Sequence, residues 1–416
     1  LPAGFIWQLM VDGAYNNGEP GFVYLDEINE HHSVDVEENP EDIIHATNPC
    51  VTGDTLVHTP DGLRRADAVS EGDEIATVLG TEAVDEKLTF EDQTVYEVEL
   101  SDGGRITATP DHRFHVVDGK DVDDTTPLRD LNEGDHIRLE PASFADSGDR
   151  ADYIEQFRRG ILVGDGSYSE KTVAQNNRLA ICFDERNETY IKNVRELFES
   201  AGYRVGEADT SSDGHALKLW VGDAQTVLDD HGLDPARSHE KDVDVTDFST
   251  ESGAQGFLDG LLVTDGNINL STNRPQIRWT TSSEDLAQTI RTLSLQLGMH
   301  GRIYTDARQE RGGTRADGSE IETKRYVHDV HIAGESAGQF ASNTAAGDYH
   351  PGIGEKLITL QTEHMSTGGL WKAKVTSIEK LDETETVYDL FAPTSDTWIT
   401  EGYVNRGSAE PKVRKG

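Results

Sequence analysis

A tandem repeat constrains the fold of this chain more than any other feature of its sequence. The apolar run of residues 157–166 ends in Asp-Gly, and residues 256–266 form a second apolar run that ends in the same pair. The likeness continues downstream, because residues 177–181 parallel residues 273–277 at an offset that stays between 96 and 100 positions. Self-similarity at a fixed period indicates duplication of one supersecondary unit. We therefore predict two similar α/β halves, each with an apolar helix followed by short strands.

The two apolar runs predict a pair of helices that cross closely. Gly160 and Gly164 on the first helix, and Gly260 on the second, leave room for close approach. Asp165 and Asp265 would then leave the helix ends side by side. Two carboxylates at a pseudo-two-fold axis attract Mg²⁺, which prefers oxygen ligands and can assist the cleavage of a phosphodiester. The alternative is that each Asp-Gly pair only ends an ordinary core helix.

Strand-like patterns lie on both sides of the repeat. Residues 50–57 contain an apolar, β-branched run after a Gly-Asp turn, which places Cys50 at the mouth of a strand. Thr109 and His112 lie three positions apart around a proline-fixed turn, where both side chains could point at one peptide bond. Residues 63–75 are echoed by residues 128–137, which suggests two pseudo-symmetric β-halves, and β-patterns return in residues 374–378, 386–391 and 397–404. We predict an α+β, multidomain chain in which an all-β domain is split by the α/β repeat.

The charge of the chain is strongly negative. It has 78 Asp and Glu residues against 37 Lys and Arg, a net charge of −41 at pH 7. Such a balance usually argues against nucleic-acid binding, which depends on Lys and Arg. The acidity is spread along the whole chain, however, so we interpret it as adaptation to a salt-rich cytoplasm rather than as disorder. No apolar run is long enough for a membrane span, and two distant cysteines, Cys50 and Cys182, fit a reducing, cytoplasmic setting.

The first 49 residues differ from the rest, since they contain neither Lys nor Arg. Residues 17–22, 26–29 and 46–50 read Asn-Gly-Glu-Pro-Gly-Phe, Asp-Glu-Ile-Asn and Ala-Thr-Asn-Pro-Cys. In this order they resemble a stretch of the adenosylcobalamin-dependent ribonucleotide reductases. The resemblance stops after Cys50, which indicates an insertion at that cysteine. Because the chain opens at Leu1 with no initiator Met, we expect a fragment of a longer polypeptide.

The segment that begins at Cys50 resembles the N-terminal splicing blocks of inteins. The Cys-x-x-Gly-Asp-Thr start and the Thr109-x-x-His112 motif carry the resemblance, and the strand around Asp389 with the aromatic strand after it resembles the C-terminal blocks. The resemblance implies a Hedgehog/intein β-fold. It also implies that Cys50 attacks the Pro49 carbonyl in an N-to-S acyl shift, while Thr109 and His112 strain and protonate the amide.

The C-terminal junction departs from that family pattern. Alignment by spacing puts Arg406 on the penultimate His, Gly407 on the terminal Asn and Ser408 on the first downstream residue, with Asp396 on another usual His. Gly407 has no side-chain amide that could cyclise, so we predict that full splicing is impaired. Asn405 offers an alternative amide two positions earlier, whose cyclisation would cut before Arg406. The chain could then be the product of a frame-shifted or truncated gene.

The repeat region resembles the two-repeat LAGLIDADG homing endonucleases that inteins carry. The resemblance implies that Asp165 and Asp265 bind Mg²⁺, and it puts Lys241 at the position of a catalytic-site lysine that would contact the nucleophilic water or the phosphate. A solvated loop lysine is the alternative for Lys241. Double-stranded DNA would lie on the β-saddles, where the following basic residues gather: Arg274, Arg278, Arg302, Arg308, Arg311, Arg315, Lys324 and Arg325.

These interpretations divide the chain into a reductase fragment (1–49), an N-terminal splicing region (50–148), the endonuclease (149–345), a C-terminal splicing region (346–407) and a tail (408–416). We expect a monomer that splices or cleaves itself, with its exteins in cis, and that makes a double-strand break in intein-free reductase DNA. Adenosylcobalamin would serve only the intact host reductase, whose activity is the alternative function. A stand-alone acidic nuclease would not explain the reductase-like prefix.

Overall fold

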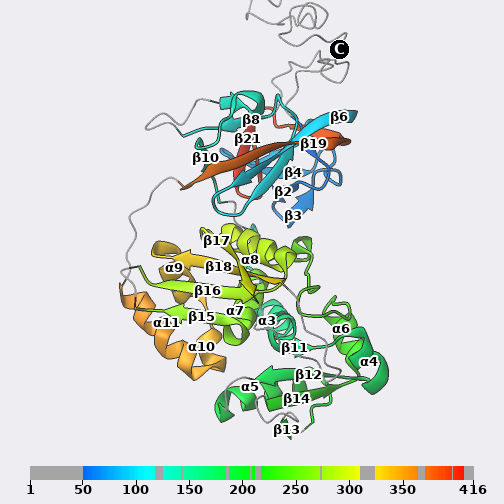
Figure 1. Ribbon diagram of the computed structural model, residues 1–416, viewed down its shortest axis with the longest axis vertical. Helices are drawn as coiled ribbons and strands as arrows, with labels where there is room; N and C mark the ends of the chain where they lie inside the picture. Colours follow the sequence, from blue (N-terminus) through cyan, green and yellow to red (C-terminus); the bar gives the residue numbers. More distant parts are fainter. Residues whose placement is uncertain are drawn as a thin grey trace, which may run out of the picture.

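The structure is a computed structural model that describes residues 50–117, 125–141, 144–183, 187–206, 209–210, 217–271, 274–309, 324–363, 371–395 and 397–406. It contains an all-β domain, and an α/β insertion lies beside this domain along the long axis of the molecule (Figure 1). The predicted fold class, an all-β domain split by an α/β insertion with repeated halves, is confirmed. The calls on residues 1–49, Asp396, Gly407 and the tail fall outside the described residues.

The β-domain is built from both ends of the described chain. Its largest sheet has 11 strands, and the segment before the insertion alternates with the segment after it, because β1 pairs with β19, β2 with β20 and β8 with β21. The elements are β1 (Val51–Thr52), β2 (Leu56–Thr59), β3 (Gly62–Arg65), β4 (Glu74–Thr77), β5 (Gly80–Ala83), β6 (Glu86–Leu100), β7 (Arg105–Ala108), β8 (Arg113–His115), β9 (Thr125–Pro127), η2 (Leu128–Asp130), β10 (His136–Leu139), β19 (Trp371–Phe391), β20 (Thr397–Thr400) and β21 (Tyr403–Arg406).

The insertion leaves and rejoins the β-domain at neighbouring positions. β10 pairs antiparallel with the start of β19, and its last residue, Leu139, lies opposite Trp371. β19 is 21 residues long in all, and from Val375 to Phe391 it pairs with β6, with irregularities in register that bend the pair. The β-sheet is therefore continuous at the point where the insertion interrupts the sequence of the β-domain.

The two echoed segments of the β-domain form matching turns. Asp73 accepts a hydrogen bond from the Ser70 amide at 2.9 Å, and Asp135 accepts one from the Asn132 amide at 2.8 Å. The glycine between each pair has a positive φ, +89° at Gly72 and +103° at Gly134, a conformation that glycine adopts without strain. The first turn leads into β4 and the second into β10. The similar sequences of residues 63–75 and 128–137 therefore contain the same local structure.

The insertion contains two four-stranded sheets with the same strand order. The first runs β11-β12-β14-β13 and the second β15-β16-β18-β17, as expected for a tandem duplication. The elements are α3 (Arg150–Asp165), β11 (Gly166–Ser167), α4 (Glu170–Asn176), β12 (Arg178–Phe183), α5 (Glu188–Glu199), β13 (Asp209–Thr210), β14 (Leu217–Gly222), α6 (Ala224–Asp230), η3 (Val245–Asp247), α7 (Glu251–Thr264), β15 (Gly266–Asn269), β16 (Gln276–Thr281), α8 (Glu284–Gln296), β17 (Arg302–Gln309), β18 (Lys324–Ala333), α9 (Glu335–Asn343), α10 (Ala346–Tyr349) and α11 (Pro351–Glu363).

Helices α3 and α7 cross at their glycines, as the sequence predicts. A Cβ atom added to Gly160 would lie 2.4 Å from the Phe257 carbonyl oxygen, and one added to Gly260 would lie 2.4 Å from the Phe157 carbonyl oxygen. The two contacts are related by the pseudo-two-fold axis of the repeat. Each helix starts at a side-chain cap: Asp149 accepts from two amides of α3, and Thr250 accepts from the Gly253 amide of α7.

The C-terminal helices belong to the core of the insertion. Residues 346–363, which the sequence analysis assigned to the C-terminal splicing region, form α10 and α11, and Ala346, Leu357 and Leu360 are buried in the same apolar cluster as α3 and α7. α10 packs against α5 and α7, and α11 packs against α9 and β15. None of the described helices is long and apolar enough to cross a bilayer.

Candidate active sites

The first candidate site lies in the β-domain, where Cys50 immediately precedes β1. Its side chain is buried, with 2% of the residue exposed. The Cys50 amide donates to Thr109 Oγ1 at 3.2 Å, and the Thr109 amide donates to the Cys50 carbonyl oxygen at 3.0 Å. These contacts extend the pairing of β1 with β7, in which Val51 lies opposite Ala108. The predicted proximity of Thr109 to the peptide unit of Cys50 is therefore present.

His112 links this junction to the C-terminal end of the domain. Its amide donates to the Thr109 carbonyl oxygen at 3.0 Å, and its Nε2 lies 2.8 Å from Asn405 Oδ1. Asn405 is completely buried on β21, and its Nδ2 donates to Thr400 Oγ1 across the β20–β21 hairpin. A chain of hydrogen bonds thus runs from Cys50 through Thr109 and His112 to Asn405, although His112 and Asn405 are 293 positions apart.

The Cys50 thiol is held in its neutral form. Burial raises the pKa of Cys50 well above its usual range, and the negative charge of Asp389 raises it further. Asp389 is itself buried, with 1% exposed, one residue after the position at which β19 pairs with β1. Deprotonation of the thiol therefore requires a base or a change of environment at this site.

The sequence analysis missed Thr400 as a partner of the C-terminal amide. A hairpin interpretation of residues 397–406 would have found it, because Glu401 and Gly402 both have positive φ and form the turn between β20 and β21. That turn brings Thr400 opposite Tyr403 and leaves its hydroxyl next to Asn405. Gly407 and Ser408, the positions that spacing assigned to the terminal amide and acceptor, lie outside the described residues.

The second candidate site lies where α3 and α7 end. A Cβ atom added to Gly164 would lie 2.0 Å from Thr264 Oγ1, so the residues that precede Asp165 and Asp265 are in contact. Asp165 is half-buried and Asp265 is exposed. Among the described residues, no three His, Cys, Asp or Glu side chains are arranged as a metal site. Two carboxylates still suit Mg²⁺, which keeps several waters and takes further oxygens from a phosphate.

Lys241 lies beside these aspartates and is not a solvated loop residue. It is 5% exposed, and its Nζ donates to the carbonyl oxygens of Val163, Gly164 and Gly166 at 2.6, 3.1 and 2.8 Å. Burial lowers the pKa of Lys241 to about 8, against the effect of the Asp265 and Asp165 charges, which raise it. The lysine therefore stabilises the C-terminal end of α3 and places a positive charge next to both carboxylates.

The basic residues predicted to bind DNA are only partly described. Arg278 on β16 and Arg302 on β17 both lie opposite His331 of β18, which puts them on one face of the second sheet. Arg302 is exposed, whereas Arg278 lies 3.7 Å from the Asp329 carboxylate. Arg274 is exposed just before β16. Arg311 and Arg315 fall outside the described residues, as do the side chains of Arg308, Lys324 and Arg325 on β17 and β18.

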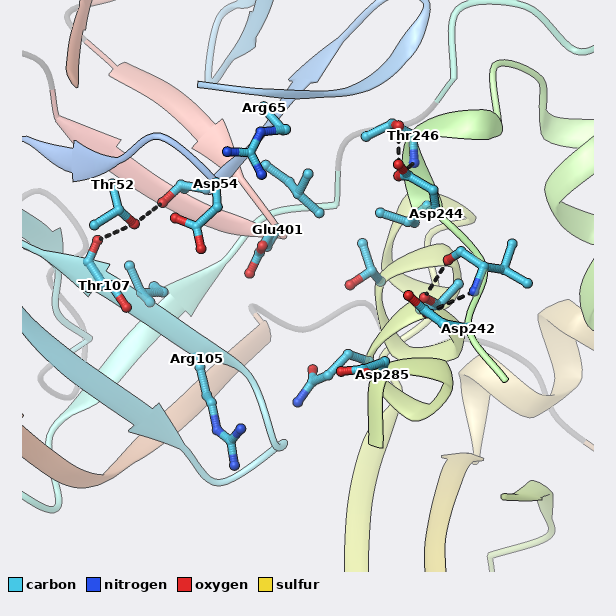
Figure 2. A pocket seen from close by; sticks show the side chains of 18 of the residues that line it. Thr52, Asp54, Arg65, Arg105, Thr107, Asp242, Asp244, Thr246, Asp285 and Glu401 are labelled. Carbon is cyan, nitrogen blue, oxygen red and sulfur yellow. Dashed lines mark hydrogen bonds between the residues drawn. The ribbon is translucent and has the colours of Figure 1, made fainter. Parts of the chain in front are cut away.

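A cavity of about 450 Å³ separates the β-domain from the insertion (Figure 2). Asp54 and Glu401 face it from one side and Asp242, Asp244 and Asp285 from the other. Burial raises the pKa of Glu401 to about 7. Lys241 does not line this cavity, and its Nζ instead contacts the carbonyl oxygens at the end of α3. The cavity contains neither Cys50 nor Asp165 and belongs to neither predicted site.

Comparison with known families decides the class of the chain. A family model described as the intein splicing domain matches residues 28–406. The chain belongs to the intein splicing domain family. The match to the intein family begins within the segment that the sequence analysis assigned to the host, and it ends at Arg406, one residue after the buried Asn405.

The intein is also similar to two curated proteins. It is 24% identical over 426 residues to ribonucleoside-diphosphate reductase NrdEB subunit alpha of Bacillus subtilis, a match that covers 95% of this chain and 38% of that protein. It is 26% identical over 292 residues to the replicative DNA helicase DnaB of Synechocystis, covering 63% of this chain and 32% of the helicase. The intein thus spans well under half the length of both relatives.

Solved structures give more remote likenesses. A mutant of the Ssp DnaB mini-intein variant M86 aligns with 86% of this chain and 98% of its own, at 9% identity and a TM-score of 0.29. A mesophilic variant of the homing endonuclease I-DmoI aligns with 47% of this chain and 90% of its own, at 13% identity and a TM-score of 0.32. Neither likeness is strong enough to support an inference about function.

Proposed function

We propose that this intein cleaves the peptide bond before Cys50 and the peptide bond after Asn405, and that its insertion is a homing endonuclease. The observation that carries the first part is the buried chain of hydrogen bonds from Cys50 through Thr109 and His112 to Asn405. It joins within one site the two residues that we propose as the junction residues. Ligation of the flanking segments is impaired, because Asn405 is followed by Arg406, which offers no nucleophilic side chain.

At the N-terminal junction, Cys50 Sγ attacks the Pro49 carbonyl carbon. The amide C–N bond breaks, a thioester forms, and the freed Cys50 amine takes up the proton that the thiol loses. Thr109 contacts both the amide and the carbonyl of Cys50, so it is placed to orient the leaving amine. His112 would deliver this proton, and the hydrogen bond from its backbone amide to Thr109 supports this role because it keeps the residue beside the junction.

At the C-terminal junction, Asn405 Nδ2 attacks its own carbonyl carbon. A succinimide forms and the Arg406 amine leaves, which releases residues 406–416. His112 holds Asn405 Oδ1 and Thr400 accepts from Nδ2, so these contacts fix the amide in one orientation. β21 pairs with β20 and β8 on its two sides, and its end must open for the reaction.

Addition of dithiothreitol to the purified chain tests the N-terminal step. In molar salt the thiol should release residues 1–49, slowly, because Pro49 restricts the attacked carbonyl. The variant Cys50→Ala should release nothing, whereas Cys182→Ala, which removes the other cysteine, should behave like the parent. Equal release from Cys50→Ala would show that the thioester mechanism is wrong.

Mass spectrometry of the C-terminal fragment tests the second step. The parent should release a peptide that starts at Arg406 and leave a chain that ends in a succinimide or its hydrolysis product. Asn405→Ala should abolish this release and keep thiol-dependent cleavage at Cys50. Release of a peptide that starts at Ser408, or ligation of Pro49 to Ser408, would instead show that the chain is cut after Gly407 and contradict the proposed role of Asn405.

The endonuclease proposal rests on the paired carboxylates at the pseudo-two-fold axis. Asp165 and Asp265 would hold Mg²⁺, which would polarise the scissile phosphates and the attacking water. Lys241 adds a positive charge between them and would stabilise charge on the phosphate. The sheet face with Arg278 and Arg302 would contact the DNA backbone, and the DNA would be the intein-free host gene across its Asn-Pro-Cys codons.

Cleavage of a linear DNA that carries those codons tests this proposal. Asp165→Asn or Asp265→Asn should abolish double-strand cutting in Mg²⁺ and leave DNA binding within about twofold, because the carboxylates act on the metal. Asp229→Asn, which alters an exposed carboxylate on α6, is the matched control. Full cutting by Asp165→Asn, or cutting without a divalent cation, would exclude the assigned roles.

The host is, in our proposal, a ribonucleotide reductase of the adenosylcobalamin-dependent class. The reductase-like residues before Cys50 and the reductase name of one relative support it. The intein itself would need neither adenosylcobalamin nor a second subunit and would act as a cytoplasmic monomer. Sequencing the gene on both sides of the Asn-Pro-Cys codons tests the host assignment.

A further inference from the structure

One turn of the β-domain packs against the surface of the α/β insertion. Residues 101–104, between β6 and β7, contact α8 and β17: the Asp102 carbonyl oxygen accepts from the Ile303 amide at 2.9 Å, and the Gly103 carbonyl oxygen accepts from Gln288 Nε2 at 2.8 Å. Two glycines make this fit possible. A Cβ atom added to Gly103 would lie 2.7 Å from Ile303 Cβ, and one added to Gly104 would lie 1.7 Å from Tyr403 Oη.

A buried ion pair lies at the centre of this contact. Arg291 of α8 donates to Asp102 Oδ2 at 2.7 Å, and both side chains are only 1% exposed. Burial alone would raise the pKa of Asp102, but Arg291 and His300 hold it well below its usual range. A charge pair removed from water in this way stabilises only while both partners are present.

The same arginine reaches the strand of the C-terminal junction. Arg291 Nη2 also donates to the hydroxyl of Tyr403, which is fully buried at the start of β21. Tyr403 precedes Asn405 by two residues, and side chains two residues apart on a strand point to the same face of the sheet. An arginine of the insertion is thus connected to the strand that positions the Asn405 amide.

We propose that Arg291, Asp102 and Tyr403 form a positioning cluster by which the insertion holds β21, and with it Asn405, in the geometry for C-terminal cleavage. The inference rests on the proposed cyclisation of Asn405. These residues do not touch the reacting atoms and act through the strand. Cys50 lies just before β1, which pairs with β7 and β19 and is not paired with β21, so we expect the two junctions to respond differently to substitution.

Three variants of the full chain test the cluster. Tyr403→Phe removes only the hydroxyl, and the double variant Arg291→Met with Asp102→Asn removes both charges, so that no unpaired charge stays buried. Arg291→Lys keeps a positively charged donor, so this variant should retain part of the C-terminal cleavage rate that the double variant loses. Glu284→Gln is the matched control, because it breaks the ion pair with Arg105, which also joins the two parts at 2.8 Å but is about half exposed.

Release of residues 406–416 is measured against thiol-induced release of residues 1–49. Tyr403→Phe and the double variant should slow the first about tenfold, the typical effect of losing a buried hydrogen bond, and leave the second within about twofold. Glu284→Gln should change neither. Equal slowing at both junctions, or no slowing at either, would overturn the proposal, since a general loss of stability has no preference for one junction.

Hydrogen exchange of the β21 amides provides a readout that needs no cleavage. It should become about tenfold faster in Tyr403→Phe and stay unchanged in Glu284→Gln. If the parent chain releases no peptide that starts at Arg406, the proposed role of Asn405 fails, while faster exchange in Tyr403→Phe still supports the cluster. Unchanged exchange in Tyr403→Phe overturns the cluster whether or not Asn405 reacts.

Discussion

At the scale of single residues, the β-domain places Cys50, the proposed nucleophile, where its thiol is difficult to ionise. The Cys50 thiol is buried, and Asp389 adds a negative charge to that environment. The sequence predicted that Cys50, Thr109 and His112 belong together, because their motifs are local and ordered. It could not predict that His112 contacts Asn405, since a contact between residues 293 positions apart depends on how the sheet closes.

The raised pKa of Cys50 predicts a steep pH dependence. A raised thiol pKa means that the thiolate forms only at high pH, so thiol-induced release of residues 1–49 should accelerate throughout the range of about pH 7 to 9. Asp389→Asn removes the negative charge that contributes to the raised pKa of Cys50. The curve of release rate against pH should therefore shift to lower pH by up to about one unit in this variant.

The shift of the pH profile is measured from initial rates of release at fixed ionic strength and a fixed dithiothreitol concentration. Ionisation of dithiothreitol affects the parent and Asp389→Asn equally, so it cancels in the comparison. Asp382→Asn, an exposed carboxylate on the same strand, is the control and should follow the parent. A profile displaced to higher pH in Asp389→Asn would show that this carboxylate acts on Cys50 in another way than through its charge.

At the scale of elements, the repeat is the part that the sequence predicts best. The period, the crossing glycines and the aspartates at the helix ends are all visible in the residues, because a packed helix pair leaves small side chains at fixed spacing. The sequence does not predict α4, which has no counterpart among the described residues of the second half, or the packing of α10 and α11 on the insertion. Both depend on which apolar surface is left uncovered after the halves assemble.

Close packing of α3 on α7 predicts a large effect of one methyl group. Gly160→Ala would bring its Cβ to 2.4 Å from the Phe257 carbonyl oxygen, where backbone must move. We expect a loss of about 1–3 kcal/mol in the free energy of unfolding, as for other overpacked sites. Urea unfolding at constant high salt measures it.

Gly352→Ala in α11 is the matched control for this substitution. Its added Cβ would lie 3.4 Å from the His350 ring, an ordinary contact, so the change should be neutral or slightly stabilising. Equal unfolding midpoints for Gly160→Ala and the parent would mean that the two helices do not pack as closely as the structure has them.

At the scale of the whole molecule, a net charge of −41 acts against compactness. Most of these carboxylates are exposed, and the ion pairs between exposed partners contribute little. The interface between the two parts adds to the problem, since carboxylates from both sides line its cavity and outnumber the two arginines there, Arg65 and Arg105. Screening by salt is the general remedy for such repulsion.

We therefore predict that salt stabilises the chain. Between about 0.1 M and about 1 M salt the Debye length falls from ~10 Å to ~3 Å, so the thermal midpoint should rise steadily. Sodium chloride and potassium chloride should act alike, because screening depends on ionic strength alone. A midpoint that falls with salt, or that depends on which cation is used, would contradict this explanation.

The adjacency of Leu139 and Trp371 has a consequence for the history of the gene. A coding segment can enter or leave at this place in a single event, because the two strands it separates already pair and need no change of register. Loss of the segment is neutral, however, only if no function of the β-domain depends on residues of the insertion. Arg291 belongs to the segment and Tyr403 does not, so under the proposed role of this pair the loss of the segment would also slow C-terminal cleavage.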